Sequence, residues 1–110
     1  MPEERLTRIS ESVHKEVLRT QLLRIVEAVY PKWLRKAEFF ITLERLSFDT
    51  FLNELDFNVQ YLAEKELLRI EEIKLGGDKE TWRAQLTAHG IDYLEGRLEE
   101  IGLASPDLVD

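Results

Sequence analysis

The sequence predicts an α+β fold in which three helices precede a two-stranded antiparallel hairpin and a final helix. Between residues 67 and 87, apolar side chains alternate with polar ones along two short runs, which is typical of half-buried strands. The alternating apolar side chains are Leu68 and Ile70 in the first run and Trp82, Ala84 and Leu86 in the second. Gly76 and Gly77, followed by Asp78, supply the positive φ angles of a tight hairpin turn. Elsewhere apolar residues recur every three or four positions, which indicates helices.

The first helix is predicted over residues 13–30, where the apolar residues form one stripe. The stripe consists of Val13, Val17, Leu18, Leu22, Ile25, Val26 and Val29. Ser10 or Ser12 can cap its start, and Pro31 ends it because proline lacks the backbone amide. Residues 1–9 are polar, and we expect them to form a flexible tail.

Two further helices are predicted before the hairpin. The second covers residues 34–45, and because apolar residues occupy most of its surface we expect it to be the most buried helix. The third begins after a turn at residues 47–50 and ends near residue 65, with Glu66 where glycine or asparagine is more usual. Its inner stripe consists of Phe51, Leu52, Leu55, Val59, Leu62 and Ala63.

The last helix is predicted over residues 88–100, with Thr87 as its N-cap. Its apolar stripe consists of Ile91, Leu94, Leu98 and Ile101. Gly102 occupies the position of a C-cap glycine, and residues 103–110 are expected to form a second flexible tail. The 110 residues therefore fit one domain spanning 1–110.

Charge is distributed unevenly along the chain, whose formal net charge is −7. Residues 1–36 contain eight Lys or Arg and five Glu, a net charge of +3, which leaves −10 for residues 37–110. A surface that binds duplex DNA usually needs a concentrated basic patch. The only net basic region is the N-terminal third, outside the elements expected to read DNA.

Composition narrows the class of protein further. The chain has no cysteine, which excludes disulfides, thiolate zinc sites and cysteine catalysis. No apolar run approaches the roughly 18 residues that a membrane span requires. The N-terminal residues lack the apolar stretch of a signal peptide, so we expect a cytoplasmic location and no contact with membranes.

The segments VQYLAEKELLRI and TWRAQLTAHGIDYLEG resemble the winged helix-turn-helix superfamily, and more narrowly the small winged-helix proteins of Mu-like phages and prophages. The matching residues are Tyr61, Leu62, Trp82, Ala84, Leu86, Thr87, Gly90, Ile91, Asp92 and Gly96. The resemblance covers about residues 15–97 and implies a three-helix bundle, a two-stranded antiparallel wing and a C-terminal helix. The matched residues are structural: we expect Trp82 and Leu86 to close the hydrophobic face and Gly90 to let the last helix approach the sheet.

The outer face of the third helix is the first candidate site, because in DNA-binding winged helices this face reads base edges. The candidate contacts on it are Asn53, Asp56, Phe57, Asn58 and Gln60. Residues 48–64 contain four acidic side chains and no Lys or Arg, and carboxylates repel phosphates. The same face could instead bind protein, with Phe57 exposed, or could simply be solvated.

Two basic regions are further candidates for nucleic-acid contact. The predicted wing tip offers Lys74, Lys79 and Arg83. The other region consists of Lys32, Arg35 and Lys36 with Trp33 among them and Tyr30 nearby. Aromatic and basic side chains together can stack on bases and hold phosphates. The alternatives are a solubilising turn at the wing and a Trp33 that packs into the core.

No pattern in the chain predicts catalysis. His14 and His89 are far apart in sequence and have no second ligand at zinc-binding spacing. No carboxylates converge and no phosphate-binding loop is present, so we expect no cofactor, metal or small-molecule substrate.

Two functions of different class follow for a non-enzymatic winged-helix protein. The resemblance implies a DNA-binding regulatory role in a phage or prophage. The residues themselves favour protein–protein association, because the recognition face is acidic and the apolar surplus on the first and third helices suits a homodimer.

Overall fold

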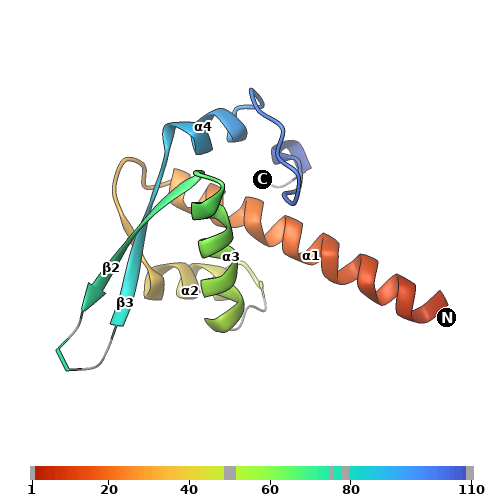
Figure 1. Cartoon of the computed structure of the whole chain (residues 1–110), viewed down its shortest axis with the longest axis horizontal. Helices are drawn as coiled ribbons and strands as arrows, with labels where there is room; N and C mark the ends of the chain where they lie inside the picture. Colours follow the sequence, from red (N-terminus) through yellow and green to blue (C-terminus); the bar gives the residue numbers. More distant parts are fainter. Residues whose placement is uncertain (1, 49–51, 75, 78–79, 109–110) are drawn as a thin grey trace.

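The computed structural model describes residues 2–48, 52–74, 76–77 and 80–108, and within residues 2–11 and 52–53 it describes the backbone only. The elements follow in the order α1 (Pro2–Glu27), β1 (Leu34–Arg35), α2 (Lys36–Arg45), α3 (Leu52–Glu64), β2 (Leu68–Lys74), β3 (Glu80–Leu86), α4 (Ala88–Leu94) and the short 3-10 helix η1 (Pro106–Leu108) (Figure 1). The prediction of an α+β fold is confirmed.

The sheet has three antiparallel strands in the order β1-β3-β2, whereas the sequence predicted two. The hairpin itself is as predicted, with Leu68 opposite Leu86 and Lys74 opposite Glu80. The additional strand β1 pairs Leu34 with Ala84, in a segment that was assigned to the second helix. Leu34 is buried, so the core face of the sheet continues through this strand.

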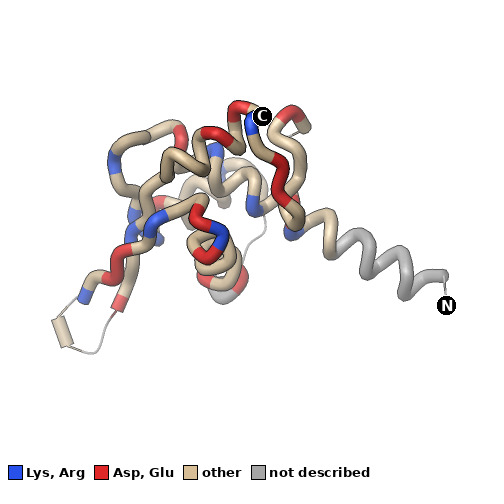
Figure 2. The backbone as a smooth tube through the Cα atoms, turned by 45° about the horizontal axis from the view of Figure 1, so that its top comes forward, with Lys and Arg blue, Asp and Glu red and all other residues tan. Residues whose placement is uncertain are grey.

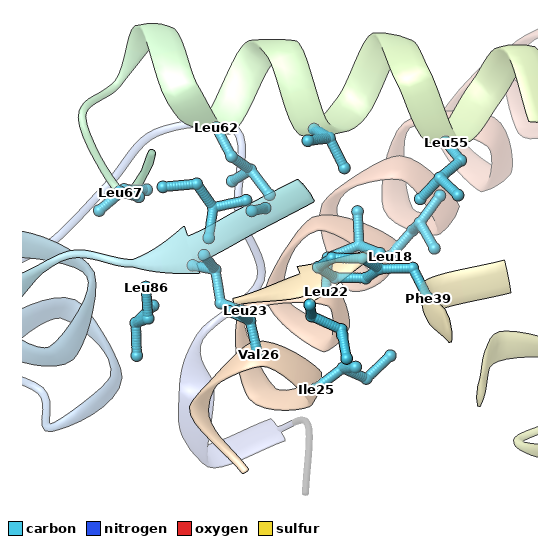
Figure 3. Packing of buried hydrophobic residues seen from close by; sticks show 14 of the residues in the cluster. Leu18, Leu22, Leu23, Ile25, Val26, Phe39, Leu55, Leu62, Leu67 and Leu86 are labelled. Atoms are coloured by element: carbon cyan, nitrogen blue, oxygen red, sulfur yellow. The ribbon is translucent and has the colours of Figure 1, made fainter. Parts of the chain in front are cut away.

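Helix α1, rather than α2, is the central helix of the core. Leu18, Leu22, Leu23 and Val26 on α1 are at most 1% exposed, and α1 contacts α2, α3, α4 and β3. Figure 3 shows these side chains pointing toward those of α3, with Phe39 of α2 and Leu86 of β3 beside them. In α2 the buried residues are Phe39 and Leu43, while Ile41 and the C-cap residue Leu46 are each 47% exposed. The expectation that the second helix is the most buried is therefore wrong.

Helix α1 is longer at its start than predicted. It begins at Pro2 instead of residue 13, so the backbone of residues 2–9 is helical rather than frayed. It ends at Glu27, and residues 28–31 form a turn. Figure 1 shows the N-terminal half of α1 extending beyond the other elements.

Helix α4 is shorter than predicted and ends at Leu94 instead of residue 100. Gly96, at φ 80°, donates its N–H to Tyr93 O (3.0 Å), and Arg97 donates to Asp92 O (2.9 Å). This is a Schellman motif, in which a glycine in left-handed geometry ends the helix. Ile101 lies beyond it and is 90% exposed, so it belongs to no helical stripe.

Residues 101–106, here called the C-terminal segment, pack against α1, although residues 103–110 were expected to form a loose tail. Leu103 is buried, and Ala104 donates its backbone N–H to Glu16 O (3.1 Å). Gly102 lies within this segment at φ 92°, eight residues beyond the last residue of α4, and does not cap a helix. The first part of the predicted tail is thus part of the folded domain.

Candidate interaction surface

Helix α3 places its candidate residues on three different sides, and Asn58 faces inward. Asn58 is 3% exposed and accepts a hydrogen bond from Arg19 Nε at its Oδ1 (2.9 Å). Its Nδ2 donates to the backbone oxygen of Glu54 (2.7 Å). Both ends of the amide are therefore engaged inside the protein, and the prediction that Asn58 contacts a partner is wrong.

The side chain of Asp56 contacts α2 and the sheet, rather than only solvent. Its carboxylate lies 2.9 Å from Lys36 Nζ and accepts a hydrogen bond from Trp82 Nε1 (2.8 Å). The Trp82 ring packs against Phe39 at 5.5 Å between centroids. Asp56 therefore connects α3 to Lys36 of α2 and to Trp82 of β3. Because Asp56 and Lys36 are paired with each other, they do not form a free contact site.

Trp82 seals the interior only in part. It is partly exposed and packs at the edge of the core, whereas Ala84 and Leu86 on the same strand face are at most 1% exposed. The indole N–H requires a polar partner, and Asp56 supplies it at this edge.

The side of α3 that does face solvent carries an exposed aromatic ring. Phe57 is 62% exposed, and Gln60 and Glu64 are exposed further along the helix. The side chain of Asn53 lies outside the described residues. No Lys or Arg occurs in α3, so this side of the helix offers an aromatic ring, an amide and carboxylates.

A hollow of about 380 Å³ opens beside Phe57, between α3 and the middle of α1. We call it the Phe57 hollow, and it is lined by His14, Lys15, Leu18, Glu54, Phe57 and Asn58. Leu18 is 1% exposed and lies at the core side of the hollow, whereas Lys15 and Glu54 are exposed. The hollow was not predicted, because it depends on how α1 crosses α3; the outward position of Phe57 was the one signal in the sequence.

At the β2–β3 hairpin, one of the three candidate cations is already paired. Arg83 Nη2 contacts both carboxylate oxygens of Glu71 (2.9 and 3.0 Å), and its guanidinium stacks on the Trp33 ring at 4.7 Å. Lys74 is exposed, and Lys79 lies outside the described residues. Figure 2 shows basic and acidic positions close together along β2 and β3. The sheet therefore has no concentrated positive surface at its described positions.

The second basic region is also divided. Trp33 is half-buried under Arg83 on the outer face of the sheet instead of in the core. Lys36 is paired with Asp56, whereas Lys32 and Arg35 are exposed. The cluster expected from the sequence is thus two exposed cations beside a structural tryptophan.

Within the described part of the chain, neither histidine belongs to a cluster of metal-ligating groups. His14 packs against Phe48 at 6.4 Å between ring centroids, and His89 Nε2 lies 3.3 Å from Glu100 Oε1. Among the described residues there is no group of three or more His, Cys, Asp or Glu side chains that could hold a metal ion. Within the same residues, no helix is both long and apolar enough to cross a bilayer.

Comparison with known proteins gives no match: no protein-family model, curated protein or solved structure is significantly similar to this chain. The assignment of function accordingly depends on the geometry described above.

Proposed function

We propose that this chain is a non-enzymatic winged helix whose third helix binds protein instead of DNA. The order of elements supports the winged-helix assignment: a short strand precedes α2, and the hairpin follows α3 and pairs with that strand. In this arrangement α3 takes the place of the recognition helix and the β2–β3 hairpin takes the place of the wing. Fold alone does not select the partner, so the choice comes from the surface of α3.

The observation that supports a protein partner is the exposed phenyl ring of Phe57 beside an apolar hollow. Interfaces between proteins are enriched in aromatic residues and depleted of charge at their centres. Base-edge recognition instead needs amides or cations on the helix, with further cations on the phosphates. Of the amides expected to read bases, Asn58 is buried, and the nearby Lys36 is paired with Asp56.

A photoreactive amino acid tests this proposal directly. A benzophenone side chain introduced at Phe57 should crosslink to protein in an extract of cells that naturally express the chain. The same group at Tyr30, which is 47% exposed in the turn that follows α1, provides the matched control. Crosslinking at both positions alike, or at neither, would contradict a protein-binding role for α3.

DNA binding is the second candidate, since Lys32, Arg35 and Lys74 are exposed and could contact phosphates. It predicts that mixed-sequence duplex is retarded at about 50 mM salt by micromolar protein and released as the salt concentration rises. Under the proposal above, no retardation is expected. Salt-sensitive retardation that is weakened by Arg35→Ala and Lys74→Ala would instead support the regulatory role in phages that the resemblance implies.

A further inference from the structure

Strand β2 lies at one edge of the sheet, and the outer side of its backbone is open. In the strand order β1-β3-β2 it pairs only with β3, along its seven residues from Leu68 to Lys74. Among the described residues, no backbone hydrogen bond except those to β3 reaches residues 68–74. An edge strand of this kind presents a row of unpaired N–H and C=O groups, which can pair with a further strand.

A hollow of about 650 Å³, here called the β2-edge hollow, accompanies this open backbone. It is lined by residues 68–72 of β2, by Gln60 and Ala63 of α3, and by Trp33. Side chains of successive strand residues point to opposite faces of a sheet. Five consecutive residues therefore line the same hollow because it follows the edge of the strand, where the two faces meet. The space lies where an added strand would place its side chains.

On the face of β2 that packs toward the core, the lining changes from apolar to acidic. Leu68 is buried, and Ile70 is half-buried against the core. Glu72 lies on the same face, opposite Trp82 in the strand register, and is exposed. Its carboxylate forms no ion pair or hydrogen bond within the part of the chain that the structure describes. This face of the edge thus offers two apolar positions followed by one unpaired negative charge.

We propose that the β2 edge binds an extended segment of another protein, which adds a fourth strand to the sheet. The segment runs antiparallel to β2, as the two existing strand pairs do. It places a Lys or Arg opposite Glu72 and apolar side chains opposite Ile70 and Leu68. In this direction the cation comes first, two residues before the first apolar side chain. Main-chain hydrogen bonds supply affinity, and the alternate side chains supply specificity.

Glu72 favours a basic segment of another protein over a second copy of this chain. When two β2 strands pair across a twofold axis, residue i meets residue j and j meets i. With the axis at residue 70, 71 or 72, Glu72 meets Leu68, Ile70 or the other Glu72, and never a cation. A segment of another protein can carry a cation at this position. The net charge of −7 also attracts a basic segment and repels a second copy.

NMR titration of the full chain with a synthetic peptide tests the proposal. The probe is acetyl-Thr-Lys-Thr-Val-Thr-Val-Thr-amide, in which Lys aligns with Glu72 and the two Val residues align with Ile70 and Leu68. Amide resonances of residues 68–74 should shift as the peptide is added up to about 5 mM, a range that detects weak binding. The β2 amides that face outward should exchange with solvent more slowly in the complex. Absence of any shift in β2 overturns the proposal.

Reversing the charge on both partners tests the register. Glu72→Lys should weaken binding of the Lys peptide about tenfold, because a cation then lies opposite a cation. A peptide with Glu in place of Lys should bind this variant more tightly than it binds the wild type. Glu44→Lys is the matched control, since Glu44 is exposed on α2 and the change in net charge is the same. Equal losses in the two variants would overturn the pairing with Glu72, and unchanged melting temperatures verify the fold.

Methylation of the peptide nitrogens distinguishes strand addition from binding through side chains alone. In an antiparallel pair, the N–H groups of alternate residues point toward the partner strand and away from it. One probe is methylated on the nitrogens of its Thr residues and the other on those of Lys and Val. Only one of the two probes should lose binding, because only one set of N–H groups faces β2. Equal binding of both probes overturns strand addition.

This inference is independent of the proposed function. Phe57 lines the hollow between α3 and α1, whereas the β2-edge hollow lies between α3 and β2, so failure of crosslinking at position 57 leaves the peptide test unaffected. Sedimentation velocity of the free chain at the concentration used for NMR completes the test. A chain that dimerises with its β2 amides protected, and that does not bind the peptide, would identify a second copy as the occupant and overturn the proposal.

Discussion

Helices α2, α3 and α4 end in the same hydrogen-bond pattern, and two of them do so without glycine. At the end of α3, Glu66 donates its backbone N–H to Ala63 O (2.9 Å) and Leu67 donates to Leu62 O (3.0 Å). This Schellman motif requires left-handed backbone geometry, and Glu66 adopts it at φ 65°. In the sequence Glu66 is an unusual residue for a helix end. The left-handed backbone geometry that it adopts is strained, because the Cβ of an L-residue is crowded there.

Replacing Glu66 by glycine should therefore stabilise the protein. We expect Glu66→Gly to raise the free energy of unfolding by about 0.5–1 kcal/mol, because glycine adopts this geometry without strain. Urea denaturation measures the effect. Glu64→Gly, two residues earlier at the last residue of α3, is the matched control and should cost up to about 1 kcal/mol. A loss of stability in Glu66→Gly would show that its side chain has a role in the folded state.

Gly90 is the opposite case, because the structure leaves no room for a side chain at this position. A Cβ at this position would lie 2.4 Å from the backbone oxygen of Leu67 and 2.7 Å from Leu86 Cδ1. We expect Gly90→Ala to lower the free energy of unfolding by about 2–3 kcal/mol, since the backbone at Leu67 cannot move aside without disturbing the sheet. Gly76→Ala, where a Cβ would meet no atom within 4 Å, should be nearly neutral. Equal melting temperatures of the two variants would contradict the close approach of α4 to the backbone of Leu67, just before β2.

At the scale of elements, α1 holds the C-terminal segment through its polar side chains. Arg19 Nη1 donates to Gly102 O (2.9 Å), Thr20 Oγ1 to Ala104 O (2.6 Å) and Arg24 Nη2 to Pro106 O (3.4 Å). Arg19 is 9% exposed and also stacks on a tyrosine ring of α3. One helix therefore satisfies alternate carbonyl groups of an irregular segment, which would otherwise remain solvated and loose.

Loss of the Arg19 side chain should release this segment. Arg19→Met keeps much of the buried aliphatic volume but leaves Asn58 Oδ1 and Gly102 O without their donor, at an expected cost of about 2–4 kcal/mol. Hydrogen exchange at the Ala104 amide, which donates to Glu16 O, should accelerate more than exchange in the sheet. Arg97→Met is the control, because Arg97 is exposed and should change stability by less than about 0.5 kcal/mol. Unchanged exchange at Ala104 would mean that the segment is held by other contacts.

The same elements show which parts of the fold the sequence could predict. The hairpin was predictable because strand alternation and the glycine turn are both local signals. Strand β1 was not predictable, since a strand of two residues shows no alternation of apolar and polar side chains. Leu34 belongs to a strand only because it pairs with Ala84. Docking of the C-terminal segment was likewise missed, because it depends on Arg19 and its neighbours, more than 80 positions away.

At the scale of the whole molecule, the candidate site was harder to predict than the fold. The helical periodicity of apolar residues shows which side chains do not face the core. It does not show which other elements those side chains contact. Asn58 and Phe57 are adjacent in sequence, yet Asn58 is buried against Arg19 and Phe57 is exposed beside the hollow. Asp56 and Arg83 look available in sequence, yet Lys36 and Glu71 pair with them across the fold. The site follows from the crossing of α1 and α3, which is a property of the assembled domain.

Tyr93 lies where α1, α4 and the C-terminal segment meet, so it reports on the integrity of the whole domain. It is 2% exposed, lies near Thr20 on α1 and donates a hydrogen bond to Ala104 O. Burial raises the pKa of Tyr93 above its ordinary value of 10.0, because the phenolate is disfavoured away from water. The hydroxyl thus favours folding only while it is protonated.

This pKa difference predicts the direction of alkaline unfolding. Below pH 10.0 Tyr93 is neutral in both states and its contribution is fully present. As the pH rises past this value the unfolded chain ionises first, so the free energy of unfolding falls until the pKa of the folded state is passed. Tyr93→Phe should be less stable at neutral pH by about 1 kcal/mol, through loss of the bond to Ala104 O, but should lose less stability between about pH 9 and pH 11. Tyr30→Phe, at a tyrosine that is 47% exposed and lies outside this junction, is the matched control for loss of a tyrosine hydroxyl in urea titrations. Identical slopes for Tyr93→Phe and the wild type would place the alkaline-sensitive group elsewhere and would argue against a sealed junction of the three elements.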